Sequence, residues 1–186
     1  MADQPLTDDV LAAALVRGPQ PVWVTLSEYN PVWPARFEVR AAQLRHVLGD
    51  RARLLEHIGS TSVPGLAAKP VIDIVVGLDD PDDESAYLPD LEAVGYDLRV
   101  REPSHRCLRV GDPDEPVNLH CYPRDHEEVR SYLVFRDRLR ASESDRQLYE
   151  ATKRSLAERE WPDMNYYADA KGDVIRAILA RSGWVD

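Results

Sequence analysis

One segment of this chain gathers the residue types that bind phosphate groups. From residue 57 to residue 76 the sequence reads HIGSTSVPGLAAKPVIDIVV, which places a Gly-Ser turn, three hydroxyls, a lysine and one acid between two apolar stretches. Loops held by rigid strands keep polar groups in place, and glycines beside hydroxyl and cationic side chains suit an anion. We therefore predict a phosphate-binding loop. Its expected contacts are Gly59, Ser60, Thr61, Ser62 and Lys69.

The acid of this segment, Asp73, stands in an otherwise apolar stretch. An unpaired carboxylate in a buried strand is costly, so Asp73 is expected to have a cation, a metal ion or several hydrogen-bond donors as partners. Metal-assisted phosphoryl or nucleotidyl transfer usually needs two carboxylates two residues apart on one strand face. Val71 and Val75 occupy both places where the second acid could stand. Asp73 is therefore a candidate catalytic and metal-binding residue without a partner acid.

Two common active-site loops do not fit the spacing. Lys69 does not follow Gly65 directly, so the segment is not the phosphate loop of P-loop nucleotide hydrolases. It also lacks the Gly-x-Ser-x-Gly pattern of a nucleophile elbow. Both classes are excluded.

Composition restricts the partners. Lys and Arg number 23 against 33 Asp and Glu, which gives 23 − 33 = −10 and disfavours general binding to nucleic acid or to an anionic membrane. The two cysteines, Cys107 and Cys121, form no CxxC pair, so we expect no structural zinc and a reducing compartment, the cytoplasm. No signal peptide or apolar run of about eighteen residues is visible, so no membrane span is expected.

Hydrophobic periodicity predicts the elements that position the loop. A leading helix is expected at 10–15, with further helices at 32–48 and 88–94. The expected strands are 22–26, 53–58, 71–78, 96–101, 107–110 and 117–122, the last three as an antiparallel meander. From residue 125 to residue 183 the apolar residues recur at helical spacing, which predicts about three helices. We predict one α+β domain over 1–186, with a mixed or antiparallel sheet and a C-terminal helical layer.

The segment from His57 to Ile74 closely resembles the signature of the GrpB family. The resemblance extends over most of residues 22–180, so the first twenty residues lie outside it. The further residues that carry it are Tyr29, Asn30, Pro31, Trp33, Phe37, Asn118, Leu119, His120, Phe135, Arg136, Asp137, Leu139, Arg140, Tyr149, Lys153, Tyr166 and Lys171. In some relatives a similar domain is joined to a dephospho-coenzyme A kinase.

The resemblance implies a nucleotidyltransferase-like fold, in which a Gly-Ser turn holds a triphosphate and strand acids hold Mg²⁺ or Mn²⁺. His120 stands where the third acid of that fold is expected, so it is a second candidate for metal binding or acid–base catalysis. A core histidine with one hydrogen bond is an equal alternative. Arg136, Lys153 and Lys171 could surround a phosphate pocket with positive charge, although charged helix faces are usually solvated or paired.

Two classes of function follow. The first is a transferase that moves a nucleotidyl or phosphoryl group from a nucleoside triphosphate to a small acceptor, with Asp73 and His120 near the metal. An alternative enzymatic function uses the same pocket for other chemistry on an anionic small molecule, with His120 as general base. The second class is a catalytically retired module that only binds a nucleotide or another anion, and the solitary acid favours it. A pure interaction protein is a third alternative.

Overall fold

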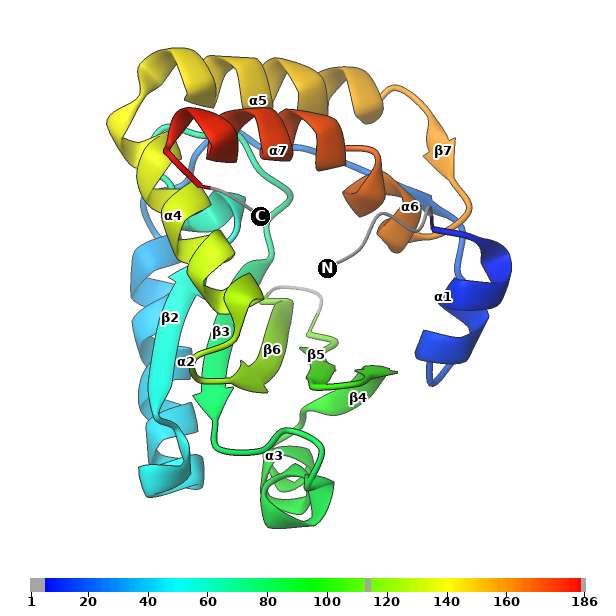
Figure 1. Ribbon diagram of the computed structural model, residues 1–186, viewed down its shortest axis with the longest axis vertical. Helices are drawn as coiled ribbons and strands as arrows, with labels where there is room; N and C mark the ends of the chain where they lie inside the picture. The colour runs from blue at the N-terminus through cyan, green and yellow to red at the C-terminus, as the bar shows by residue number, and fades with distance from the viewer. Residues whose placement is uncertain (1–5, 113–114, 185–186) are drawn as a thin grey trace.

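In the computed structural model, which describes residues 6–112 and 115–184, five strands form one mixed sheet. They are β2 (Leu54–Ile58), β3 (Ile72–Leu78), β4 (Asp97–Glu102), β5 (His105–Val110) and β6 (Val117–Pro123). The strand order is β2-β3-β6-β5-β4, with β3 parallel to β6 and the other neighbours antiparallel. The predicted α+β class is confirmed, and so is the antiparallel meander of β4, β5 and β6 (Figure 1).

Helices flank the sheet and extend beyond it. The helices that precede β6 are α1 (Asp8–Ala14), α2 (Trp33–Leu48) and α3 (Leu88–Ala93). Those that follow β6 are α4 (Glu127–Ala141), α5 (Glu143–Leu156), α6 (Met164–Asp169) and α7 (Gly172–Arg181). The expected C-terminal layer is therefore present as three longer helices and the short α6, and α5 and α7 lie across the top of the molecule in Figure 1.

The two faces of the sheet differ in chemistry because side chains alternate along each strand. One face of β3 places Ile72, Ile74 and Val76 in the main apolar core, together with buried residues of α2. The other face presents Asp73 and Val75, beside Asn118 and His120 of the parallel strand β6. Polar groups thus collect on the face opposite the main core.

The loop between β2 and β3 is fixed by the C-terminal helices. Val63 and Leu66 are fully buried against Leu139 of α4, Tyr149 of α5 and Ile178 of α7. These contacts hold the Gly-Ser turn in place at the end of the polar sheet face. The C-terminal helices therefore position the loop that the sequence singles out.

Some predicted boundaries are wrong. The strand expected at 22–26 is only β1 (Val22–Trp23), which pairs with β7 (Glu160–Trp161) in a separate two-stranded sheet. Neither β7 nor its pairing is visible in the local pattern, since two residues carry no periodicity. The strand expected at 107–110 begins at His105, after a tight turn in which Ser104 has φ +59°. This difference brings His105 onto the sheet.

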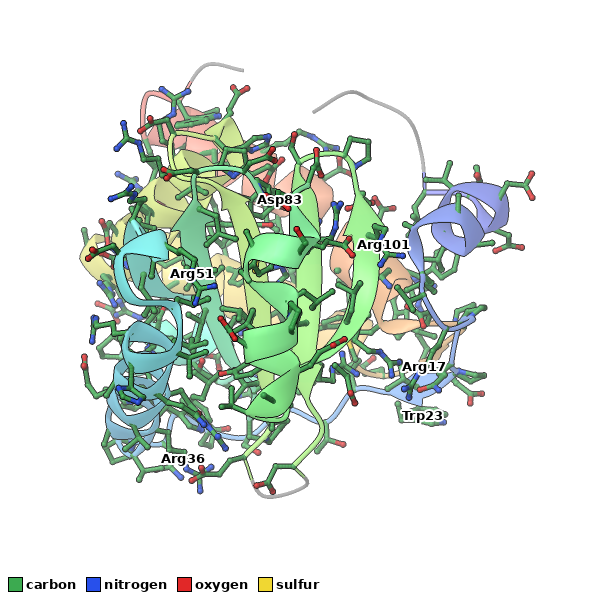
Figure 2. All side chains as sticks on the ribbon, turned by 90° about the horizontal axis from the view of Figure 1, so that it is seen from below. Arg17, Trp23, Arg36, Arg51, Asp83 and Arg101 are labelled. Carbon is green, nitrogen blue, oxygen red and sulfur yellow. The ribbon has the colours of Figure 1, made fainter. Side chains whose placement is uncertain are left out.

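Within residues 6–112 and 115–184, none of the helices is long and apolar enough to cross a membrane. Arginine side chains supply positive charge around the outside of the molecule. Figure 2 shows Arg51 and Arg101 on the side of the molecule that is seen from below, and Arg17 nearer its edge.

Candidate functional site

The Gly-Ser turn is shaped by the acid on the next strand. Gly59 has φ +69°, in the left-handed region that favours glycine, and a Cβ built there would lie 2.4 Å from Oδ2 of Asp73. Glycine is therefore required both by the backbone and by the space that the carboxylate occupies. The carboxylate of Asp73 lies directly against the turn.

A row of polar side chains crosses three strands at Asp73. The amide Nδ2 of Asn118 donates to Oδ1 of Asp73 at 2.8 Å, and Nε of Arg109 donates to Oδ1 of Asn118 at 3.1 Å. The register of β3, β6 and β5 places the three residues side by side. Asp73 thus has one hydrogen-bond donor, Asn118, among its partners, and the predicted cation, metal ion or further donors stay a prediction at this point.

Two lysines lie within the electrostatic reach of Asp73. Burial lowers the pKa of Lys69, and the carboxylate of Asp73 opposes this shift. Burial likewise lowers the pKa of Lys171 to about 8, again against the effect of Asp73. Lys171 precedes α7 and its Nζ lies 4.6 Å from the ring centre of Tyr167. A single carboxylate therefore faces two partly desolvated ammonium groups.

The third lysine reaches the turn from α5. Nζ of Lys153 donates to Oγ of Ser60 at 3.1 Å and to the carbonyl oxygen of Ala67, and it lies 5.0 Å from the ring centre of Tyr149. The residue is 2% exposed. Burial, followed by the positive charge of Lys171, lowers the pKa of Lys153 to about 7. We call Ser60, Lys69, Asp73, Lys153 and Lys171 the lysine site.

The lysine site contains every lysine of the chain. Of the 23 basic residues, 20 are arginines and three are lysines. Among the described residues, each cation within ion-pair distance of a carboxylate is an arginine or a histidine. The lysine count is readable from the sequence, and it is the signal that would have joined Lys69, Lys153 and Lys171 into one site.

The other two hydroxyls of the turn bond to the loop itself. Oγ1 of Thr61 donates to the carbonyl of Val71 at 3.0 Å, and Oγ of Ser62 donates to the carbonyl of Gly59 at 2.6 Å. His57 lies 3.1 Å from Oγ1 of Thr61, and burial, with the charges of Arg140 and Arg136, lowers its pKa to about 4. Neutral His57 therefore supports the turn. A direct phosphate contact from Thr61 or Ser62 stays a prediction.

Arg136, unlike the three lysines, bonds to carboxylates of the chain itself. Its guanidinium donates to Glu56 at 2.8 Å, to Asp137 at 2.8 Å and to the carbonyl of His57 at 3.1 Å. Arg140 donates to the carbonyl of Ser62. These arginines fix α4 against β2 and the turn, so a ligand contact by Arg136 stays a prediction that its bonds do not support.

His120 lies beside a pair, His105 and Glu102, that no motif of the sequence singles out. Nδ1 of His120 lies 3.3 Å from Nε2 of His105, whose Nδ1 lies 2.7 Å from Oε2 of Glu102. Burial lowers the pKa of His120, but Cys107 and, less strongly, Asp73 raise it, and the net shift is upward. Cys107 and His120 are directly opposite in the register of β5 and β6, so the interaction between the thiol and the imidazole follows from strand pairing.

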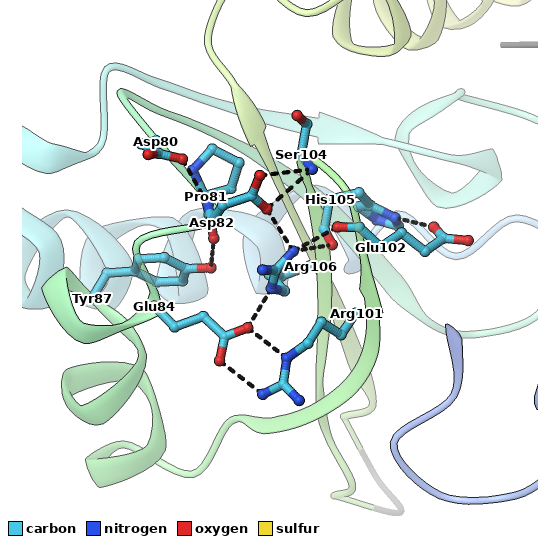
Figure 3. Close-up of polar contacts among 10 residues, drawn as sticks. All are labelled: Asp80, Pro81, Asp82, Glu84, Tyr87, Arg101, Glu102, Ser104, His105 and Arg106. Carbon is cyan, nitrogen blue, oxygen red and sulfur yellow. Dashed lines mark hydrogen bonds and ion pairs between the residues drawn. The ribbon is translucent and has the colours of Figure 1, made fainter. Parts of the chain in front are cut away.

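A network of arginines and acids on the other side of the β4–β5 hairpin holds these residues in place (Figure 3). Arg106 contacts Asp82 at 2.9 Å and Glu84 at 2.5 Å, and it donates to the carbonyls of Glu102 and His105. Arg101 contacts Glu84 at 2.7 Å. We call Asp82, Glu84, Arg101 and Arg106 the arginine network. It fixes the backbone of the residues that orient His120.

A divalent metal ion fits this donor set poorly. Asp73 supplies the one carboxylate, Nδ2 of Asn118 already donates to it, and Lys69 and Lys171 bring positive charge to the same place. Among the described residues, no group of three His, Cys, Asp or Glu side chains is arranged to hold a metal ion. Mg²⁺ or Mn²⁺ at Asp73 and His120 stays a prediction.

Comparison with known proteins identifies the family. A family model described as "GrpB protein" matches residues 23–181. The chain belongs to the GrpB family. A UPF0157 protein of Halalkalibacterium halodurans is 46% identical over 183 residues, which is 96% of this chain and 93% of that protein. The crystal structure of the conserved protein GrpB from Enterococcus faecalis matches with TM-score 0.72 and 30% identity, covering 85% of this chain and 96% of that one.

One more distant relative has another printed activity. A dephospho-CoA kinase of Mycolicibacterium paratuberculosis is 28% identical over 210 residues, covering 98% of this chain. The match spans 51% of that protein, about half of its length. The GrpB fold is thus similar to a region within a longer protein named as a kinase.

Proposed function

We propose that this member of the GrpB family binds a phosphorylated small molecule, such as a nucleotide, at the lysine site. The observation that carries the proposal is that the three lysines of the chain lie close together, with Lys69 and Lys171 within the electrostatic reach of the single carboxylate of Asp73 and Lys153 within that of Lys171. Desolvated ammonium groups without matching acids are costly, and a phosphate group would restore the missing negative charge. Ser60 and Asn118 would add polar contacts around it.

The charge of the whole protein bears on how such a ligand binds. A net charge of −10 repels anions at long range, so affinity has to come from short-range contacts to the lysines. With a pKa of about 7, Lys153 is only partly protonated near neutral pH. A bound phosphate favours the ammonium form, so binding takes up protons. Proton uptake therefore distinguishes this site from exposed arginines, which are always charged.

Calorimetric titration with inorganic pyrophosphate, in buffers of different ionisation enthalpy at about pH 7.5, measures both binding and proton uptake. We expect binding with net uptake of protons. Replacement Lys69→Met should weaken binding about tenfold or more, because a charge-assisted hydrogen bond contributes about 1.5 to 3 kcal/mol. The control Arg53→Gln removes an exposed cation that pairs with Asp79, and it should bind normally.

Two outcomes contradict the proposal. The first is no binding of pyrophosphate or ATP at about 1 mM. The second is binding that Arg53→Gln weakens as much as Lys69→Met does.

The finer alternatives differ in turnover. Nucleotidyl or phosphoryl transfer from a nucleoside triphosphate would require Asp73 for the reaction, whereas a binding module would lose only affinity in Asp73→Asn. The donor set around Asp73, rich in cations and poor in carboxylates, supports the binding module. Titration of ATP with and without Mg²⁺ or Mn²⁺, on the wild type and on Asp73→Asn, separates the two. Metal-dependent release of pyrophosphate that Asp73→Asn abolishes would favour the transferase.

A further inference from the structure

Ser60 and Lys153 form a close pair between elements far apart in the chain. Ser60 follows the left-handed Gly59, at the start of a short 3-10 turn over Ser60–Ser62, and Lys153 lies on α5. Their Oγ and Nζ atoms are 3.1 Å apart. The hydroxyl of Tyr149, one turn earlier on α5, also bonds to Ser60. Ser60 is half-buried, so its hydroxyl is less enclosed than the lysine behind it.

The surroundings of Lys153 allow a neutral amine. Its side chain is almost fully buried, and one N–H donates to the carbonyl of Ala67, which leaves the lone pair free to face Ser60 when the amine is neutral. The charged groups around it are Lys171, which precedes α7, and, on α5, Glu150 and Arg154. Burial and Lys171 favour the neutral form, while Glu150 opposes them and is itself bound to Arg154 and to the backbone N–H of Ala67.

We propose that Ser60 is a nucleophile activated by Lys153, and that the pair cleaves carboxylic esters that carry an anionic group. Serine–lysine pairs perform this chemistry in hydrolases of several folds. A neutral ester carbonyl at Ser60, unlike a bound phosphate, does not stabilise the ammonium form, so it leaves Lys153 able to act as a base. Lys69 and Lys171 would bind the anionic group of the substrate. The inference uses the lysine site but does not require the proposed phosphate binding.

The step balances with water as the only co-reactant. Oγ of Ser60 attacks the carbonyl carbon, its proton passes to Nζ of Lys153, and the carbon–oxygen bond to the leaving alcohol breaks as Lys153 returns the proton to that oxygen. Water, deprotonated by Lys153, then attacks the acyl group on Ser60. The carboxylic acid leaves, and the serine hydroxyl is restored with the proton from Lys153.

An alkyl fluorophosphonate probe tests the nucleophile directly. Attack by Ser60 forms an oxygen–phosphorus bond and releases fluoride. We expect one equivalent of probe per chain, located on Ser60 by peptide mass spectrometry and absent in Ser60→Ala. The labelling rate of the wild type should rise through a midpoint of about 7, where Lys153 becomes neutral.

The variant Lys153→Arg tests whether Lys153 acts as a base or only as a positive charge. Arginine keeps the positive charge but cannot be deprotonated, so labelling should fall about 100-fold or more. The matched control Ser155→Ala changes an exposed serine on α5 and should label like the wild type. Circular dichroism checks that Lys153→Arg folds, and if it does not, the pH profile of the wild type decides.

Three results would overturn the inference: no labelling, labelling at another residue, or a labelling rate independent of pH between about 6 and 9. In addition, p-nitrophenyl hydrogen succinate should be hydrolysed faster than p-nitrophenyl acetate, and Lys69→Met should remove this preference. Equal rates in the wild type would contradict the anionic substrate class. If Ser60 is labelled but pyrophosphate does not bind, the proposed function fails and this inference stands. The reverse result leaves phosphate binding intact and rejects the nucleophile.

Discussion

The arginine network and the lysine site are both clusters of charged side chains on the same sheet, but their charges are matched differently. Arg106, with 7% of its side chain exposed, contacts two carboxylates, and Glu84 contacts two arginines. At the lysine site, by contrast, Lys69 and Lys171 share the single carboxylate of Asp73, and Lys153 adds a third positive charge near Lys171. One cluster has its partners within the chain, and the other has an excess of positive charge.

The residue types explain the difference. Arginine stays charged and offers several donors in a fixed plane, which suits permanent pairing with carboxylates. Lysine loses its proton readily when buried, so it can adjust to a ligand that comes and goes. Because Glu84 accepts bonds from Arg101 and Arg106, its pKa is lowered to about 2 despite opposing burial, whereas burial lowers the pKa of Lys153 to about 7. Matched charges indicate structure, and unmatched ones indicate a binding site.

The largest expected effect is on the arginine network. Replacement Arg106→Met removes a buried guanidinium that bonds to Glu84, Asp82 and two backbone carbonyls, and we expect a loss of about 3 kcal/mol in the free energy of unfolding. Urea denaturation measures this loss. Arg101→Met is the matched control, since its side chain is 52% exposed and its removal should cost about 1 kcal/mol or less. Equal losses of unfolding free energy in the two variants would show that the buried Arg106 contributes no more to stability than the exposed Arg101.

The second prediction concerns the pH dependence of stability at the lysine site. The pKa of Lys153 is lower in the folded state, about 7, than in the unfolded chain, so between pH 7 and about 10 the unfolded chain binds more protons and stability rises with pH. We expect this group to add about 2 kcal/mol between about pH 7 and 9.

Urea denaturation without phosphate at both pH values, on the wild type and on Lys153→Met, isolates this contribution. The increase in the free energy of unfolding between the two pH values should be smaller by about 2 kcal/mol in Lys153→Met than in the wild type. A variant with the same pH profile as the wild type would mean that Lys153 keeps an ordinary pKa in the folded protein.

The smallest predicted effect is a change in a single pKa. Asp73→Asn removes the carboxylate that raises the pKa of Lys171, so that pKa should fall below about 8. Lys153 serves as the internal control, because Asp73 is not among the groups that shift its pKa. With only three lysines in the chain, carbon-13 labelling of lysine gives resolvable NMR signals. An unchanged Lys171, or an equal shift in Lys153, would argue against the arrangement of charges at Asp73.

Several features of the site were predictable from local sequence. Gly59, Ser60 and Asp73 belong to one continuous motif, and the apolar run around Asp73 predicts the buried strand β3 correctly. The need for partners at Asp73 also follows from the cost of burying a carboxylate. By contrast, the sequence does not distinguish Arg136 from Lys153, because both are cations on predicted helices. Only the structure separates them: Arg136 bonds to Glu56 and Asp137, whereas Lys153 bonds to Ser60.

His105 shows why the rest could not be predicted. Its role beside His120 depends on where β5 begins and on the register of β5 with β6, and a shift of one residue would place it on the other face. Local periodicity does not fix strand ends to that accuracy. The pairing of β1 with β7 is invisible for the same reason, since two-residue strands are stabilised by their partner rather than by their own pattern.

The sequence by itself determined the GrpB family, the α+β class, the Gly-Ser turn and the solitary acid on an apolar strand, because each depends on residues close together in the chain. It also contained the count of three lysines. Only the tertiary structure decided that these lysines share one site and that Lys153 reaches Ser60, because desolvation and charge interactions depend on distances in space between β3, α5 and α7.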